Sequence, residues 1–254
     1  MITTSSRSQG AGRASVRTAF LLACSAGAWA VTIVWARSLG NGPGTMGLGA
    51  PEFVGMWTVM MSAMMLPTTI SAAPNNSSGH SMSRYAAGLI AFSVGYIAVW
   101  AAVGLPAFVL AWWGGRLVAA HPAGAIAAAV GLFAVCGTYQ LSPIKMRALR
   151  RCHVAEAQND LPGTSINGVP MARGIRYGRT CVRCSWALMA LLIAFGVMQL
   201  WAMPALSGLV ILERRWPTTT AARVIGVVAL AFGIAVAFDP ALAQGLHAPT
   251  GMHM

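Results

Sequence analysis

Apolar residues along this chain fall into long blocks separated by polar stretches rich in Gly, Pro, Ser and Arg. Each block is roughly 18 to 28 residues long, which is the length that a helix needs to cross about 30 Å of hydrocarbon. The pattern therefore predicts an all-α fold, a polytopic bundle of about six transmembrane helices. The predicted spans are residues 18–36, 53–71, 85–113, 122–142, 184–212 and 221–238.

The segments outside these blocks define the rest of the chain. Residues 1–17 are polar and rich in Ser and Arg, so we expect a disordered basic tail followed by an uncleaved first span. Residues 18–240 form the predicted membrane domain, with a core at 50–215, and residues 241–254 form a His- and Met-containing C-terminal tail. The linker 143–183 is too polar to span a membrane, so we predict a long basic loop there.

Composition supports the membrane interpretation. The chain is 57% hydrophobic and 9% charged, whereas a soluble domain carries about 25% charged residues. Its net charge of +12, from 17 basic and 5 acidic residues, would suggest nucleic-acid binding in a soluble protein. In a membrane protein, basic residues in short loops instead orient the helices. The predicted partner is therefore the lipid bilayer and not nucleic acid.

The distribution of basic residues predicts an orientation. With six spans and a cytoplasmic N-terminus, 12 basic residues lie on the cytoplasmic side and 5 on the other side. Eight of the 12 belong to the linker 143–183. Because cytoplasmic loops carry the excess of Lys and Arg, we expect the linker and both termini to be cytoplasmic.

Methionine is concentrated in the second predicted span. Its thioethers form two adjacent stripes on one helix and belong to Met56, Met60, Met61, Met64 and Met65. Thioether sulfur is a soft, neutral ligand that suits Cu(I), and it can lie in lipid without a charge penalty. The alternative is that these side chains only fill gaps in apolar packing. Pro67 follows the cluster and is expected to kink the helix.

Cysteines flank the basic linker. Cys181 and Cys184 form a C-x-x-C pair at the predicted start of the fifth span, and Cys152 and His153 lie near the other end of the linker. A helix N-terminus and nearby Arg residues would lower the thiol pKa, and a reducing cytoplasm would disfavour a disulfide. These residues therefore predict a metal site, with thiol exchange or no role at all as the alternatives.

Further candidate ligands are Met189, in the fifth span, and His253, in the tail beside Met252 and Met254. Imidazole and thioether together accept both copper oxidation states. Glu213 is expected to form an interfacial ion pair with Arg214 or Arg215. The chain has no phosphate-binding loop, dinucleotide fingerprint, H-E-x-x-H or G-x-S-x-G motif, so we assign no catalytic residue.

Four motifs together resemble the DUF2182 family of bacterial integral membrane proteins, which are predicted to bind metal. They are Met56-Trp-Thr-Val-Met-Met-Ser-Ala-Met-Met-Leu-Pro67, Tyr139-Gln-Leu-Ser-Pro-Ile-Lys145, Cys181-x-x-Cys184-x-Trp-Ala-Leu-Met189 and Glu213. The resemblance implies an inner-membrane location and a metal, but no settled activity. Ala148 and Ser185 stand where family members often have cysteine, and His153 stands where they usually have arginine.

The hypothesis that these observations favour is a metal-binding membrane accessory protein, not an enzyme, that handles or relays copper. A membrane copper enzyme under assembly, or another membrane subunit, would be its partner. Two alternatives remain open at this point. One is a subunit of a membrane oxidoreductase or monooxygenase, and the other is a structural subunit whose Met and Cys side chains only pack.

Overall fold

The computed structural model describes residues 3–40, 42–74, 81–157, 169–216 and 219–246, with the backbone alone for 3–11 and 157. Its described residues form helices and contain no strand, so the predicted all-α class is confirmed. The helices are α1 (Thr3–Leu39), α2 (Ala50–Met65), α3 (Met82–Ala120), α4 (Pro122–Leu141), α5 (Pro143–Ala157), α6 (Pro170–Phe195), α7 (Ala202–Arg215) and α8 (Thr219–Phe238). Three short 3₁₀ turns join them: η1 (Leu66–Thr69), η2 (Pro240–Leu242) and η3 (Gln244–Leu246).

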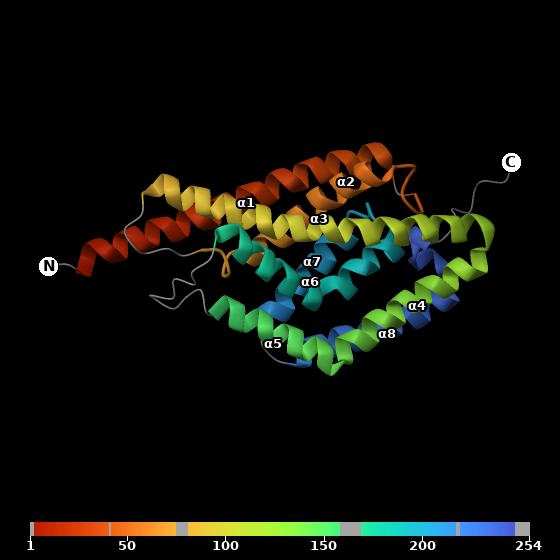
Figure 1. Cartoon of the computed structure of the whole chain (residues 1–254). Coiled ribbons are helices and arrows are strands. Elements are labelled where there is room, and N and C mark those ends of the chain that lie inside the picture. The colour runs from red at the N-terminus through yellow and green to blue at the C-terminus, as the bar shows by residue number, and fades with distance from the viewer. Residues whose placement is uncertain (1–2, 41, 75–80, 158–168, 217–218, 247–254) are drawn as a thin grey trace.

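The helices form one elongated bundle around α6 (Figure 1). α3 packs along α6, and α2 lies between α1 and α3. α4 and α8 form an antiparallel pair that contacts α6 through α4, while α5 and α7 pack against its remaining sides. α6 is accordingly the most buried of the five apolar helices long enough to cross a membrane.

Those five helices are α1 from Gly12 onward, α3, α4, α6 and α8, so the predicted count of six spans is wrong. The predicted second span consists of α2, with 16 residues, and η1 around Pro67. Its α-helical part is shorter than the roughly 20 residues that a span needs. The predicted fifth span is divided into α6 and α7 at Gly196, whose φ of 104° favours glycine.

Two segments expected to lack structure are helical. Residues 3–17, expected to be a disordered tail, form the first turns of α1, where Arg13 lies over the ring of Tyr85 and Arg17 donates to the carbonyl of Ala73. The linker 143–183 is not a loop, because α5 and the first half of α6 occupy most of it. Apolar positions in the long helices continue into these polar turns through tertiary contacts that composition does not reveal.

The two ends of the described chain lie at opposite ends of the bundle (Figure 1). The start of α1 contacts Tyr85 near the start of α3, whereas Leu246 lies against Gly114 near its end. Those two positions on α3 are about 44 Å apart along the helix axis. This arrangement disagrees with the predicted location of both termini on one side of the membrane, which needed an even number of crossings.

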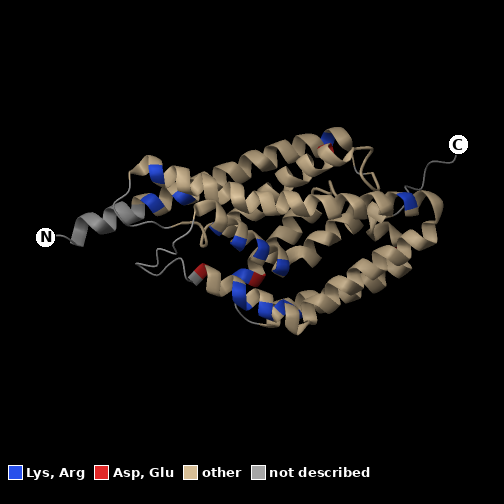
Figure 2. Cartoon of the chain, in the orientation of Figure 1, with Lys and Arg blue, Asp and Glu red and all other residues tan. Residues whose placement is uncertain are grey.

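Charge is distributed unevenly along the bundle (Figure 2). Among basic residues with described side chains, only Arg37 and Arg116 lie at the end where α1 and α3 finish. The others lie toward the end formed by the starts of α1, α3 and α6, by α5 and by the last turn of α7. We call this region the basic end.

α3 and α6 approach so closely that each needs a glycine at the contact. A Cβ atom on Gly95 would lie 2.2 Å from the carbonyl oxygen of Met171, and one on Gly174 would lie 2.0 Å from that of Phe92. Small residues commonly allow such close helix packing in membranes. The contact holds Phe92 and Tyr96 of α3 against the Tyr177 ring of α6.

A buried ion pair joins the remaining helices. The Nζ of Lys145 in α5 lies 2.6 Å from Oε2 of Glu213 in α7, and both side chains are almost fully buried. Lys145 also donates to the carbonyl of Cys184 in α6, and Gln140 of α4 donates to the other oxygen of Glu213. One lysine and one carboxylate thereby connect four helices.

We expect Lys145→Met to destabilise the protein by about 3–5 kcal/mol, because it leaves the Glu213 carboxylate buried without its cation. Lys145→Met combined with Glu213→Leu should recover a large part of that loss, since no unpaired charge then remains. The measurement is thermal unfolding in detergent, with Arg147→Met on the exposed face of α5 as the control. Equal losses in the single and double variants would contradict this assignment.

Candidate metal centre

Three cysteines converge where α5 meets α6. Cys152 comes from α5, Cys181 and Cys184 come from α6, and all three are buried. The Cys152 thiol is hydrogen-bonded to Cys184, and this bond, together with burial, raises the pKa of Cys152 above its ordinary value. Cys152 is therefore the proton donor of the pair.

The surroundings of the C-x-x-C pair differ from the sequence prediction. Cys181 lies about three turns after Pro170, where α6 begins, so a helix N-terminus does not reach it. The nearby positive charge belongs instead to Arg214 of α7, whose Nη2 lies 2.8 Å from Sγ of Cys181 and 3.9 Å from Sγ of Cys184. A cation at this distance offsets part of the cost of burying a thiolate, the form that binds metal.

Arg214 is held by oxygen atoms on its other side. Its Nη1 lies 2.6 Å from the Tyr177 hydroxyl and 3.3 Å from Oε1 of Glu156. The Tyr177 hydroxyl also lies 2.7 Å from that Glu156 oxygen, which is partly exposed. The guanidinium is thus shared between a carboxylate near the surface and a buried sulfur.

Each of the other predicted ligands has a distinct place. His153 donates from Nε2 to the carbonyl of Arg214, 3.1 Å away, which leaves Nδ1 as its remaining ring nitrogen. Met189 is buried in α6, about 7 Å along the helix axis from Cys184. His253 lies outside the described residues. In the described part of the chain, no three Cys, His, Asp or Glu side chains surround a common point suited to a metal ion.

The methionine helix ends against this thiol cluster. All five candidate thioethers of α2 are buried, those of Met56, Met60, Met61, Met64 and Met65. The Tyr96 hydroxyl lies 3.4 Å from the carbonyl oxygen of Met65 and 3.1 Å from Sγ of Cys181. Ser207 of α7 donates to the carbonyl of Met64, and Tyr177 donates to that of Thr68 in η1. The soft ligands of α2 and α6 therefore belong to one continuous region of the interior.

Several residues of this region were not assigned by sequence. Glu213 and Arg214 were expected to pair with each other or with Arg215 near an interface, but Glu213 pairs with Lys145, Arg214 pairs with Glu156, and Glu213 and Arg214 are both buried. The signal available was that Lys145 is the chain's single lysine and ends one of the motifs quoted above. Tyr96 and Tyr177 carried no comparable signal, because tyrosines are common near span ends.

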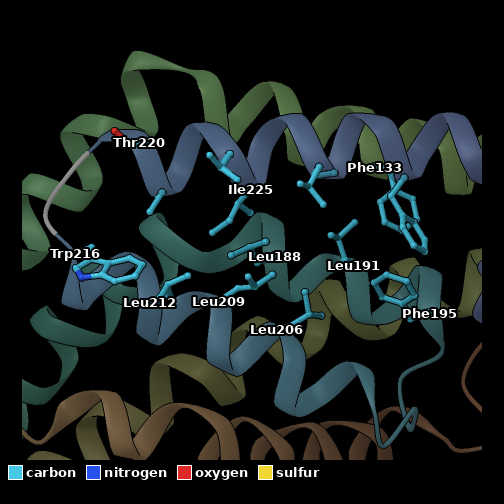
Figure 3. A pocket seen from close by; sticks show the side chains of 15 residues that line it. Phe133, Leu188, Leu191, Phe195, Leu206, Leu209, Leu212, Trp216, Thr220 and Ile225 are labelled. Carbon is cyan, nitrogen blue, oxygen red and sulfur yellow. The ribbon is translucent and has the colours of Figure 1, made fainter.

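A separate cavity can be set aside as a metal site. It has a volume of about 410 Å³ and lies between α8 on one side and α6 and α7 on the other (Figure 3). Its lining is almost entirely aliphatic and aromatic, with residues such as Leu188, Leu209 and Phe232. No thiol, thioether or imidazole lines it, so it offers a metal ion nothing to bind.

Comparison with known proteins completes the description of the site. A family model described as "PpoB2: Copper chaperone" matches residues 54–236, which include α2, the three cysteines and the buried ion pair. No curated protein and no solved structure matches the chain. The match agrees with the copper-related character inferred from the motifs, and it does not bear on the DUF2182 name. The chain belongs to the PpoB2 copper chaperone family, and its role is a copper-related accessory role in a membrane.

Proposed function

We propose that the protein holds Cu(I) on the thioethers of α2 and on the thiols of Cys152, Cys181 and Cys184, and passes it on during assembly of a copper enzyme in the same membrane. The observation that carries the proposal is the position of Tyr96, between the last turn of the methionine helix and Cys181. Neutral thioethers and thiolates are the ligands that select Cu(I) among the common metals.

Arg214 supports exchange of the metal rather than its permanent storage. Its guanidinium already donates to Cys181, so copper binding there replaces a hydrogen bond to a fixed cation. When copper leaves, the same guanidinium is available to stabilise the sulfur again. A site that can fall back on an internal cation releases its metal at a smaller cost than one that leaves a buried thiolate unpaired.

The ligand set is also small for a closed metal site. Ala148 and Ser185 stand at the positions where the resemblance suggests further cysteines, and the Ser185 hydroxyl donates to the carbonyl of Cys181. Structural metal sites usually provide four protein ligands, whereas sites with open positions exchange them. The reduced thiol number therefore favours handing copper on.

The charge distribution supports an orientation for this route. By the rule that basic segments stay in the cytoplasm, the basic end faces the cytoplasm of a bacterial inner membrane. α2 starts near Gly44, which contacts Gly115 toward the end of α3, and so begins at the opposite, outer end. The methionines then lie within the bilayer, and the thiols lie at its cytoplasmic edge. The end of the described chain at Leu246 lies on the outer side in this orientation.

Replacing Cys181 and Cys184 together by Ser should lower the copper bound per chain by at least about tenfold, because even the loss of an outer partner of a metal site is felt on that scale. The measurement is copper content after Cu(I) loading of protein purified in mild detergent under reducing conditions. Cys24→Ser with Cys136→Ser removes as many thiols away from the cluster and should retain copper. Unchanged copper in the C-x-x-C variant would exclude the thiol site, and absence of copper from the wild type would support a structural subunit.

Replacing Met56, Met60 and Met64 together by Leu should lower copper transfer while the protein still accumulates. Leu matches Met closely in volume, so each swap costs less than about 1.5 kcal/mol in packing but removes the sulfur. The readouts are protein abundance, bound copper and activity of a copper enzyme in the same cells. Met82, Met146 and Met171, which are not fully buried, provide a control triple of the same chemistry. Full copper occupancy and transfer in the α2 variant would remove the methionines from the route.

A further inference from the structure

A second cavity lies at the surface where α4 ends and α5 crosses α6. It has a volume of about 480 Å³, and its lining includes Arg147 and Arg151, one turn apart on α5, and Arg183 of α6. The three arginines are exposed, and apolar and aromatic side chains complete the walls, among them Ile144, Val182 and Trp186. The cavity therefore combines concentrated positive charge with an apolar wall.

Nothing in the described structure neutralises this charge. No carboxylate lines the cavity, and none of the three guanidinium groups forms an ion pair within the described residues. Like charges in one cavity repel, and they raise the local concentration of anions. Arginine also matches phosphate oxygens with two parallel hydrogen bonds, which a single ammonium group cannot do.

The location indicates which anion the cavity meets. The apolar span of α4 ends at Leu141, and Arg176, Arg179 and Arg183 precede the apolar half of α6. Between these two points the rings of Tyr139 and Trp186 pack with centroids 5.0 Å apart. Tyr and Trp are enriched at the level of lipid headgroups, and basic pockets between helices on the cytoplasmic side bind anionic headgroups. The cavity thus opens at the interface.

We propose that this cavity binds the headgroup of an anionic phospholipid, with Arg147, Arg151 and Arg183 on the phosphate and with the acyl chains along Ile144, Val182 and Trp186. The proposal goes beyond copper handling and does not depend on it. Its consequence is structural, because Arg151 and Arg183 each adjoin a cysteine of the thiol cluster in sequence. A lipid bound across α5 and α6 would hold Cys152 against Cys184.

The test compares lipid retention in two variants of equal charge. In the first, Arg147, Arg151 and Arg183 are replaced by Gln. In the second, Arg150, Arg176 and Arg179, which are exposed on the same two helices outside the cavity, are replaced by Gln. Full-length protein in mild detergent is titrated with phosphatidylglycerol and with phosphatidylcholine, and bound lipid is counted by native mass spectrometry. The wild type and the second variant should bind one phosphatidylglycerol, and affinity in the first should fall roughly a hundredfold for three lost charges.

Two further arms separate a lipid from other causes. Arg→Lys replacements at the three cavity positions keep the charge and should retain more lipid than the Gln variant, even if either change lowers the unfolding temperature. Brominated phosphatidylglycerol should quench tryptophan fluorescence less in Trp186→Phe than in the wild type. Equal retention in the two Gln variants, or equal binding of the two lipids, would overturn the proposal. Displacement of the lipid by millimolar inorganic phosphate would overturn it too, since the cavity would then be a site for a free anion.

Discussion

The need to pair every buried charge dictates the arrangement around the thiols. Lys145 and Glu213 lie in an interior where an isolated ionised group would cost several kcal/mol, so each must keep its partner. Their geometry leaves little freedom to the helices that carry them. Gln140 and the Cys184 carbonyl complete the shell, which places α4 and α6 relative to the ion pair. The Cys184 backbone is consequently located by a lysine from α5, the same helix that supplies Cys152.

The next residue of α7 serves a second network. Arg214 points to Glu156, Tyr177 and Cys181, whereas Glu213 points to Lys145, so adjacent side chains bind different neighbours. The Arg214 carbonyl adds a third link by accepting a hydrogen bond from His153. α7 is therefore too short to be a transmembrane helix and acts instead as a short segment that positions the cysteines. Its break from α6 at Gly196 permits this return into the bundle.

Sequence reasoning predicted the features that depend on composition and local spacing. Long apolar blocks indicated helices, and the clustering of Met and Cys identified side chains that lie in one buried region. It failed where tertiary contacts decide. The apolar stretch 184–212 contains no proline before Pro204, so a reversal that depends on φ at one glycine was not visible. Neither Arg214 nor Tyr96 could be placed, because their importance comes from a cysteine many residues away in sequence.

The two kinds of sulfur are distributed as the dielectric environment requires. Thioethers carry no charge in any state, so the α2 methionines can lie inside the bilayer without a counter-ion. Thiols become anionic when they bind metal, and they lie where Arg214 and Lys145 provide positive charge. A copper ion moving from α2 to the thiols would exchange weak neutral ligands for stronger anionic ones. Movement in that direction is favourable, and the guanidinium beside Cys181 offsets part of the cost of the opposite step, release.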